Sequence, residues 1–305
     1  MAGAPLRIVT LNAFLPGYRL VRDWVDRHNH QIVLVVTPPI GANRRYSADA
    51  NPFVLDLPAG SDVLVTGKLR EVAAPMIAAM APDLVISAAF PRLIPAEILA
   101  IPALGALNLH PSVLPAGRGP NPIRLVYEGA TTVGATLHRT ERDFDTGAIL
   151  SQRERPLPAE LTGPALFAAW NEMLAEVLAE GAARAIAGEP GRPQDAALAT
   201  DARPFTEAES LIDLTEPAAT IRRRVAALNV TEPRARARIG SSEVTVHEVR
   251  IDPHRRRGEP GTVLAEDLTG WTVQAGDVAV RITGRARPGE SSDQAALSGA
   301  RGLPG

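Results

Sequence analysis

The sequence predicts an α/β protein in which a doubly wound, mostly parallel sheet is followed by a smaller, β-rich and barrel-like domain. Short apolar runs that do not alternate with polar residues are the first observation, because such strands are typical of a parallel sheet buried on both faces. Segments with helical spacing separate these runs, which is the second observation. The third is a segment at 188–205, rich in proline, glycine and polar residues, that divides two patterns of elements.

The N-terminal part of the chain alternates strands and helices. Residues 7–11 and 31–36 are continuous apolar strands, and the segment between them, 18–30, has apolar residues at helical spacing. The alternation continues with strands at 63–65, 84–86, 104–109, 134–138 and 148–152 and helices at 70–81, 95–100, 121–128 and 163–187. A helix that joins two parallel strands forms a βαβ unit, so we predict a Rossmann-like domain with its site at the carboxyl ends of the strands.

A second group of elements follows this first part. A helix is predicted at 217–228, because Thr215 can cap its start and Pro217 suits its first turn. Short β segments are predicted at 235–250, 261–264, 271–275 and 278–283, which favours a small barrel. We therefore expect four regions along the chain: a catalytic domain at 1–188, a linker at 189–205, a barrel-like domain at 206–288 and a flexible tail at 289–305.

The composition excludes several classes of function. The chain has 305 residues and a net charge of −2, so it has no overall field that would favour nucleic acid or an anionic membrane. No apolar run approaches the ~20 residues of a membrane-spanning helix, and the N-terminus lacks a signal-peptide pattern, so we expect no membrane partner and a cytoplasmic location. Cysteine is absent, which excludes disulfides, thiolate nucleophiles and cysteine-based metal sites. The oligomeric state is left open.

Polar side chains suited to catalysis gather between residues 108 and 147. Asn108 and His110 are two residues apart at the end of a predicted strand, so both point to the same face. Pro111 and Pro115 then end the strand and open a loop. Asp145 stands in the turn between two later strands, within the sequence Asp-Thr-Gly. An amide, an imidazole and a carboxylate at strand ends are typical of a catalytic site.

Each of these residues has a simpler interpretation when it is taken alone. A single histidine is more often structural than catalytic, and Asp-Thr-Gly is an ordinary hairpin turn. Asn108 beside His110 favours a site, because a buried amide at a strand end needs polar partners. The conjunction decides: a strand, Asn-x-His-Pro, a loop rich in proline and glycine, a helix, a strand and Asp-Thr-Gly.

The same motifs resemble the folate-dependent formyltransferase family. The resemblance is carried by Asn108-x-His110-Pro-Ser-x-Leu-Pro115, Gly117-Arg-Gly119, Gly134-Ala-Thr-Leu-His138 and Asp145-Thr-Gly147. It covers nearly the whole chain, and the two-domain layout is similar to that of the methionyl-tRNA formyltransferases, including the segments 205–213 and 258–264. The resemblance implies an enzyme that transfers a formyl group from N10-formyltetrahydrofolate to an amine.

The resemblance also implies roles for three residues. Formyl transfer passes through a tetrahedral intermediate with a negatively charged oxygen, so Asn108 would donate a hydrogen bond to the formyl oxygen. His110 would stabilise the same oxygen and move protons, and Asp145 would orient His110 and relay a proton from the amine. No covalent intermediate and no metal are expected. We interpret His138 as an ordinary strand residue.

Folate contacts follow from the family's arrangement. The pterin of family members lies beside the loop that follows the strand before the Asn-x-His strand, and in this chain that loop is 87–94. Residues 112–115 and 140–145 would complete the pocket. The expected folate contacts are Ala88, Phe90, Arg92, Ile94, Ser112, Val113, Leu114, Pro115 and Asp143. For Ile94 and Leu114, an ordinary place in the core is an equally good interpretation.

The acceptor is less clearly indicated, because the sequence departs from the methionyl-tRNA formyltransferases in three places. The first strand runs into Leu11-Asn-Ala-Phe-Leu-Pro instead of a Gly-Thr-Pro turn. The insertion after the second strand, at 37–46, keeps two arginines but has no lysine. Asn229-Val-Thr-Glu-Pro233 stands where an Asn-Pro-Trp-Pro-like segment is usual.

The second domain also lacks an excess of basic residues. Residues 206–305 contain 14 Arg and 14 Asp plus Glu, so their charges sum to zero, whereas affinity for tRNA depends on phosphate neutralisation. We interpret the arginines at 222–224, 234–238 and 255–257 as solvated or ion-paired. We therefore predict that the acceptor is a primary amine of a small molecule, such as an amino sugar, an amino acid or a natural-product intermediate. Initiator methionyl-tRNA is the main alternative.

Two further alternatives stay open. A hydrolase would release formate from the same folate with water as the acceptor, and a folate-binding module would carry out no reaction. The two loops that depart from the tRNA enzymes supply the expected acceptor contacts, for which an ordinary surface loop is the competing interpretation. These contacts are Asn12, Phe14, Arg44, Arg45 and Tyr46.

Overall fold

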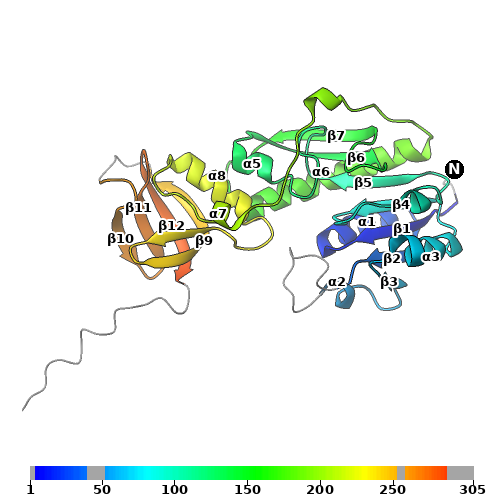
Figure 1. Ribbon diagram of the computed structural model, residues 1–305, viewed down its shortest axis with the longest axis horizontal. Coiled ribbons are helices and arrows are strands. Elements are labelled where there is room, and N and C mark those ends of the chain that lie inside the picture. The colour runs from blue at the N-terminus through cyan, green and yellow to red at the C-terminus, as the bar shows by residue number, and fades with distance from the viewer. Residues whose placement is uncertain (1–3, 40–51, 253–257, 287–305) are drawn as a thin grey trace, which may run out of the picture. The chain divides into compact units, whose positions relative to one another are not determined.

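The computed structural model describes residues 4–39, 52–252 and 258–286. The chain divides into two compact units (Figure 1). The first, which we call the catalytic unit, contains Met1–Leu125, Ala130–Leu157 and Ala168–Pro204. The second unit contains Val126–Gly129, Pro158–Phe167 and Phe205–Gly305. The predicted contacts Arg44, Arg45 and Tyr46 and the predicted tail at 289–305 lie outside the described residues.

A seven-stranded sheet forms the centre of the catalytic unit, with the strand order β3-β2-β1-β4-β5-β6-β7. The first five strands in this order pair in parallel, whereas β6 and β7 pair antiparallel. The strands are β1 (Arg7–Asn12), β2 (Gln31–Thr37), β3 (Val63–Val65), β4 (Leu84–Ala88), β5 (Ala106–His110), β6 (Thr132–Arg139) and β7 (Ile149–Pro156). The predicted doubly wound, mostly parallel sheet is confirmed.

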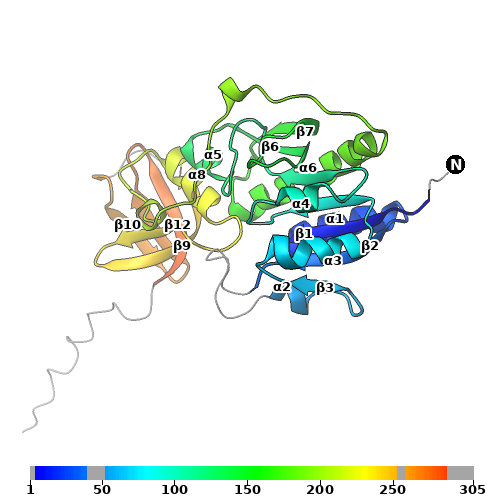
Figure 2. The ribbon, with the colours of Figure 1, turned by 45° about the vertical axis from the view of Figure 1, so that its right-hand side comes forward.

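Helices cover this sheet because its strands are apolar on both faces. On β2, Val35 packs with Tyr18 of α1 (Leu15–Arg27). The neighbouring residues Leu34 and Val36 point the other way and pack with Ile77 of α3 (Ala74–Ala79). Figure 2 shows these helices beside the strands. The remaining helical segments of this unit and its borders are α2 (Pro52–Leu55), the π-helix Leu69–Ala73, α4 (Ala96–Leu99), α5 (Arg124–Glu128), α6 (Gly163–Ile186) and the 3-10 helix Ala196–Leu198.

The helices predicted at 18–30 and 70–81 differ from the structure in their bounds or type. The helix predicted at 18–30 spans Leu15–Arg27, because Pro16 fits its first turn and Asn29 adopts a left-handed φ of 55° just after its end. The helix predicted at 70–81 begins as the π-helix, in which the N–H of Ala73 reaches the carbonyl of Lys68, and continues as α3. Pro75 lies at this junction and lacks the N–H that a regular helix uses.

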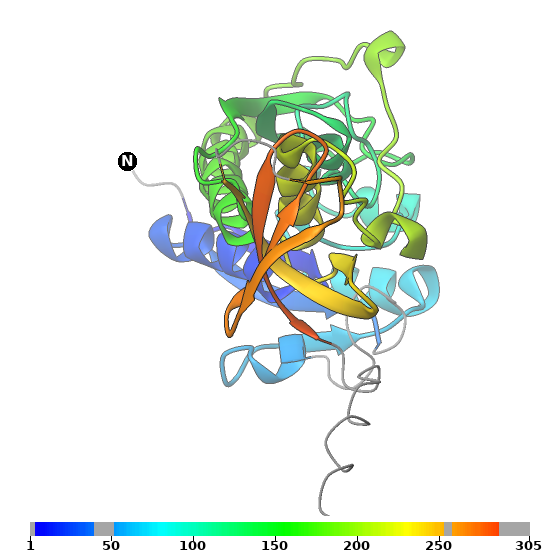
Figure 3. The same cartoon turned by 90° about the vertical axis from the view of Figure 1, so that its left-hand side faces the viewer.

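The second unit contains a curled, five-stranded antiparallel sheet with the order β10-β11-β12-β9-β8 (Figure 3). Helix α8 (Ala218–Leu228) buries Ile221 and Val225 against this sheet, together with Val246 and Ile282. The strand predicted at 235–250 is a hairpin instead, because Gly240, with a φ of 60°, forms its turn. The strands are β8 (Arg236–Ile239), β9 (Ser242–Asp252), β10 (Val263–Asp267), β11 (Gly270–Gln274) and β12 (Ala279–Ala286).

Residues 189–204, which we call the strap, are hydrogen-bonded along the catalytic unit, although the sequence suggested a linker. Near its start, the Arg139 guanidinium donates to the carbonyls of Glu189 and Pro190. Farther along, Arg192 exchanges two backbone hydrogen bonds with Ile149. Its end is held by Arg124, which is 3% exposed and donates to the carbonyls of Arg203 and Pro204. Among the described residues, no helix has the length and apolar character to span a bilayer.

Candidate active site

Strand β5 brings Asn108 and His110 to one face at its carboxyl end. Four of its five residues are buried, and Asn108 is the half-buried exception, so its amide is held in place while remaining accessible. His110 is 4% exposed. The paired strand β6 places His138 directly opposite Asn108. Two polar residues of β5 and one of β6 therefore share one region of the sheet.

The turn between β6 and β7 carries Asp145 to the same place. Asp145 has a φ of 55°, a conformation that costs energy for a residue with a side chain. Gly147 follows, and a Cβ there would collide with the carbonyl of Arg139, so only glycine fits. This tight turn aims the carboxylate back toward β5, and the side chain of Asp145 is only 9% exposed.

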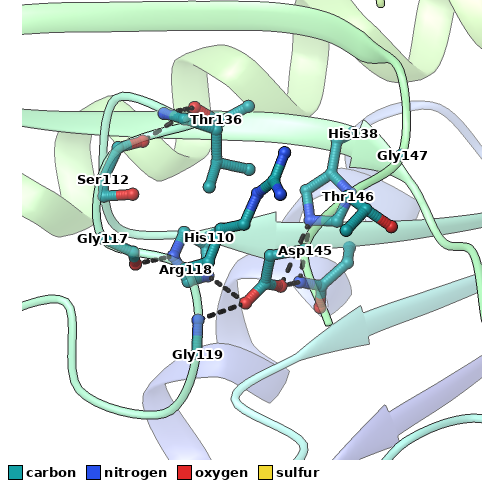
Figure 4. A network of polar contacts seen from close by, with 12 residues as sticks. His110, Ser112, Gly117, Arg118, Gly119, Thr136, His138, Asp145, Thr146 and Gly147 are labelled. Atoms are coloured by element: carbon teal, nitrogen blue, oxygen red, sulfur yellow. Dashed lines mark hydrogen bonds and ion pairs between the residues drawn. The ribbon is translucent and has the colours of Figure 1, made fainter. Parts of the chain in front are cut away.

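The Asp145 carboxylate is the centre of the polar network (Figure 4). Its Oδ1 accepts a hydrogen bond from Asn108 Nδ2 at 3.1 Å and lies 3.5 Å from His138 Nε2. Its Oδ2 accepts from the backbone N–H of Gly119 at 2.8 Å and lies 3.5 Å from His110 Nδ1. Burial raises the pKa of Asp145, but His110, His138 and the Gly119 N–H together outweigh it and hold the pKa at about 2. The carboxylate is therefore ionised at neutral pH.

His110 is neutral at neutral pH. Burial lowers the pKa of its imidazole, and nearby His138 lowers it further, against the opposing effects of Asp145 and the Gly117 carbonyl. Its Nε2 lies 2.8 Å from the Gly117 carbonyl oxygen, which can only accept, so we assign the proton of the neutral ring to Nε2. Nδ1 is then the basic nitrogen, and a proton added there would face the Asp145 carboxylate.

His138 belongs to this network, although the sequence suggested an ordinary strand residue. It does lie on β6, but its Nδ1 is 2.7 Å from the carbonyl of Arg139, which assigns the ring proton to Nδ1. Its Nε2 then accepts from Asn108 Nδ2 at 3.1 Å. Asn108 thus donates to Asp145 and His138 together, and this fixes which way its amide points. The sequence alone could not predict this role of His138, because it depends on the antiparallel register that pairs His138 with Asn108.

Hydrogen bonds and core packing from the rest of the protein hold the predicted folate loop at 87–94 in place. Asn12 Nδ2 donates to the carbonyl of Ala88 at 2.9 Å, and Ala89 has a left-handed φ of 55°. Arg92 donates to the carbonyl of Gly67 at 3.0 Å. Phe90 packs on the hydrophobic core beside Ile94, which is 4% exposed, so the core interpretation describes Ile94 well. Asp143 is exposed in the turn before Asp145.

The predicted folate segment 112–115 is fastened to β6 and β7. The hydroxyl of Thr136 donates to the Ser112 carbonyl at 2.7 Å, and Gln152 Nε2 donates to the Leu114 carbonyl at 2.8 Å. Leu114 is 2% exposed, so it is a core residue. Val113 and Pro115 are half-buried. These hydrogen bonds fix the position of the segment relative to β6 and β7.

Of the expected acceptor residues, Asn12 and Phe14 lie within the part of the chain that the structure describes. Asn12 is completely buried; its amide donates to Ala88, as above, and its Oδ1 accepts from the Thr10 hydroxyl at 2.5 Å. We therefore correct the expectation that Asn12 contacts the acceptor, because it is buried, its amide N–H group holds β1 to β4 and its oxygen is bonded within β1. Phe14 is half-buried at the start of α1. In the described residues, no group of three or more His, Asp or Glu is arranged to hold a metal ion.

Comparison with known sequences gives two matches that together span both parts of the chain. Residues 15–180 match the family described as formyl transferase, and residues 204–301 match the formyl transferase C-terminal domain. A methionyl-tRNA formyltransferase of Roseiflexus sp. (strain RS-1) is 35% identical over 285 residues, covering 90% of this chain and 85% of the relative. One from Aromatoleum aromaticum is 36% identical over 231 residues, covering 75% of this chain and 72% of the relative.

Solved structures share the fold at low sequence identity. HypX from Aquifex aeolicus, in complex with tetrahydrofolic acid, has a TM-score of 0.69 at 19% identity; the match covers 92% of this chain but 44% of HypX. WlaRD, a sugar 3N-formyl transferase, has a TM-score of 0.63 at 15% identity, with 94% and 99% covered. A methionyl-tRNA formyltransferase from Clostridium thermocellum has a TM-score of 0.54 at 14% identity, with 81% and 94% covered.

The geometry of the site and the sequence matches agree. The residues that the sequence singled out as a catalytic set, Asn108, His110 and Asp145, lie within hydrogen-bonding or ion-pairing distance around one buried carboxylate. Both domain matches and the extent of the 35% identity cover nearly all of the chain. This chain belongs to the formyl transferase family.

Proposed function

We propose that this chain transfers a formyl group from N10-formyltetrahydrofolate to the amino group of methionyl-tRNA. The observation that supports this acceptor is the sequence similarity to a methionyl-tRNA formyltransferase, at 35% identity over 285 residues. That similarity extends through the second domain, which also matches the family's C-terminal domain. It favours methionyl-tRNA over the small-molecule amine that we predicted from the sequence.

The charge states of the site suit the proton transfer that this reaction requires. The amine nitrogen forms a bond to the formyl carbon and gives up a proton, and the bond from that carbon to N10 then breaks as N10 takes up a proton. His110 is neutral and Asp145 is ionised, so the pair can accept the proton of the amine. On Nδ1 this proton would be stabilised by the Asp145 carboxylate, which lies 3.5 Å away. His110 can then return the proton from Nδ1 to N10.

Asn108 supplies the hydrogen-bond donor for the developing oxyanion. Both of its amide N–H groups point to Asp145 and His138, at 3.1 Å each. To bind the formyl oxygen, one of these hydrogen bonds must be exchanged for one to the substrate. The hydrogen bond to Asp145 is the one that is kept, because its acceptor is a charged carboxylate, so the hydrogen bond to His138 is the one exchanged. His138 therefore holds the donor ready and releases it as charge develops on the oxygen.

A small-molecule amine stays the second candidate, and the charges of the second unit favour it. Arg224 pairs with Glu216 at 2.5 Å, and Arg236 pairs with Glu207 at 2.9 Å and Glu243 at 3.2 Å. Arg250 and Arg281 also form ion pairs, with Glu248 and Asp267. An arginine that already neutralises a carboxylate contributes less to phosphate binding, so these residues supply little of the basic surface that tRNA needs.

One experiment separates the acceptors. Purified protein is given 10-formyltetrahydrofolate with an isotopically labelled formyl group and, in separate reactions, initiator methionyl-tRNA, a panel of amino sugars and amino acids, or no acceptor. We expect label on methionyl-tRNA and none with His110→Ala. Label on one of the small amines and none on the tRNA would overturn the proposed acceptor. Free labelled formate without any amine would identify a hydrolase instead.

A further inference from the structure

We infer that Gln194 of the strap is a positioning residue for the catalytic carboxylate, because its amide fastens the Asp145 turn to the loop 117–119. The inference rests on the proposed formyl transfer, in which Asp145 acts on His110. It concerns the part of the chain that the sequence suggested to be a simple connection between domains.

The Gln194 side chain makes hydrogen bonds with every polar group that it has. Its Nε2 donates to the carbonyl oxygens of Asp145 and Gly147, both at 2.8 Å. Its Oε1 accepts from Nε and Nη2 of Arg118, at 3.2 Å and 2.7 Å. The two donors of this amide therefore bind the Asp145 turn, and its acceptor binds the loop 117–119 through Arg118.

The direction of this side chain sets it apart from its neighbours. Within 192–198 every residue except Gln194 is exposed, whereas Gln194 is half-buried and points into the catalytic unit. A residue that served only to connect two domains would not need an inward amide with matched partners. Removing it would leave the Asp145 and Gly147 carbonyls without these donors. These donors help to hold a turn in which Asp145 itself adopts a left-handed φ of 55°.

The position of the carboxylate depends on both loops that Gln194 joins. Asp145 Oδ2 accepts from Gly119 N–H, which lies next to Arg118, and faces His110, whose other nitrogen is hydrogen-bonded to Gly117. A shift of the turn relative to the loop would therefore change the distance from Asp145 to His110. Misplacement of a reacting group by about 1 Å lowers rates by about 100-fold.

The strap holds the loop at a second place. Thr200 accepts from the N–H of Gly117 through its hydroxyl at 2.9 Å, and its carbonyl accepts from the N–H of Arg118 at 2.9 Å. The N–H of Ala202 donates to the Arg118 carbonyl at 2.7 Å. Thr200 and Ala202 thus bind only the loop 117–119. Gln194 binds both this loop and the Asp145 turn, so it is placed to set the spacing between them.

The test compares Gln194→Glu and Gln194→Ala in the full-length protein. Glutamate keeps the length of the side chain and its acceptor for Arg118 but replaces both donors by oxygen. Asp195→Ala is the matched control, because Asp195 lies in the strap beside Gln194 and caps the N–H of Ala197, away from the catalytic loops. We measure kcat, the KM of the formyl donor, the unfolding temperature and the NMR titration of His110, whose signal is identified with His110→Asn.

We expect both Gln194 variants to lose about 10- to 100-fold in kcat while the KM of the formyl donor changes less than about three-fold. In Gln194→Ala, the His110 titration should move to lower pH, because Asp145 raises the pKa of His110 whereas burial and His138 lower it. Asp195→Ala should change neither quantity. If Gln194→Ala does not fold, Gln194→Glu decides.

A fall in unfolding temperature with unchanged kcat and an unchanged His110 titration would overturn the inference and leave Gln194 a purely structural role. The same conclusion would follow if Asp195→Ala lowered kcat as much as the Gln194 variants. The titration needs no acceptor. It therefore judges the role of Gln194 even if the wild-type protein formylates neither tRNA nor small amines, an outcome that would count against the proposed function alone.

Discussion

At the scale of single residues, one carboxylate organises the site. Asp145 receives hydrogen bonds from an amide side chain and a backbone N–H and lies between two imidazoles. Its charge is stabilised by groups that come from three separate parts of the chain. Its burial would otherwise favour the protonated form, so the network is what keeps it ionised.

Replacing Asp145 with asparagine should remove this charge while keeping the shape of the side chain. We expect kcat to fall by about 10²–10⁴-fold, because protonated His110 then loses its stabilising partner. The control is Asp62→Asn, which changes an exposed carboxylate just before β3, at the edge of the sheet, and should leave kcat nearly unchanged. Initial rates at saturating formyl donor measure both. Wild-type kcat for Asp145→Asn would remove Asp145 from the mechanism.

The two titrating groups also predict how stability depends on pH. The pKa of Asp145 is about 2 in the folded protein against an ordinary 3.8, so its contribution is complete above pH 3.8 and is lost as pH falls toward 2. The folded pKa of His110 is below its ordinary 6.5, so the unfolded chain binds this proton more readily. The free energy of unfolding should therefore decrease as pH falls below 6.5.

Urea denaturation at several pH values measures this dependence. Between pH 7 and pH 5, wild-type protein should lose more stability than His110→Asn, which has no imidazole at this position. Between pH 4 and pH 2.5, it should lose more than Asp145→Asn. Equal losses in the variants and the wild type would show that neither group has the pKa shift described above.

At the scale of secondary structure, apolar runs predicted every strand of the parallel part of the sheet. Strands that are buried on both faces of a parallel sheet are apolar throughout, so they appear in the sequence as continuous apolar runs. Asn108 and His110 could be assigned to one face for the same reason: side chains alternate along a strand. His138 could not be placed, since its role depends on the register between β5 and β6. Gln194 could not be found either, because its partners lie 47 to 76 residues away.

Gly147→Ala should disrupt the turn that positions Asp145. Its Cβ would collide with the Arg139 carbonyl, which belongs to backbone and cannot move aside easily. We expect a loss of about 1–3 kcal/mol in the free energy of unfolding, together with a fall in kcat. Gly258→Ala is the control, because a Cβ there meets its nearest neighbour at 3.5 Å. Unfolding in urea measures the change, and equal stability of the two variants would contradict the description of this turn.

At the scale of the whole molecule, the chain consists of a catalytic unit that contains the polar network and a second unit with its own hydrophobic core. The sequence indicated a candidate catalytic set because the motif that carries it is local and specific. It could not identify the acceptor, because that depends on surface charges whose pairing is visible only in three dimensions. Arg236, for example, forms ion pairs with Glu243, which is 7 residues away in the sequence, and with Glu207, which is 29 residues away.

The proposed acceptor makes the reaction sensitive to salt. Binding of tRNA releases counterions, so two phosphate contacts would raise the KM of methionyl-tRNA by about ten-fold between 50 and 200 mM salt. The KM of the formyl donor should change much less and is the internal control. Rates are measured at both salt concentrations with each substrate varied in turn. A KM of methionyl-tRNA that does not respond to salt would argue against phosphate contacts.

Transfer of labelled formyl from 10-formyltetrahydrofolate to initiator methionyl-tRNA tests the central claim most directly. The wild-type protein should give formylmethionyl-tRNA at a rate that Asp145→Asn and His110→Ala each reduce at least 100-fold. If the wild type transfers no formyl group to this tRNA, or if both variants remain as active as the wild type, the claim is contradicted.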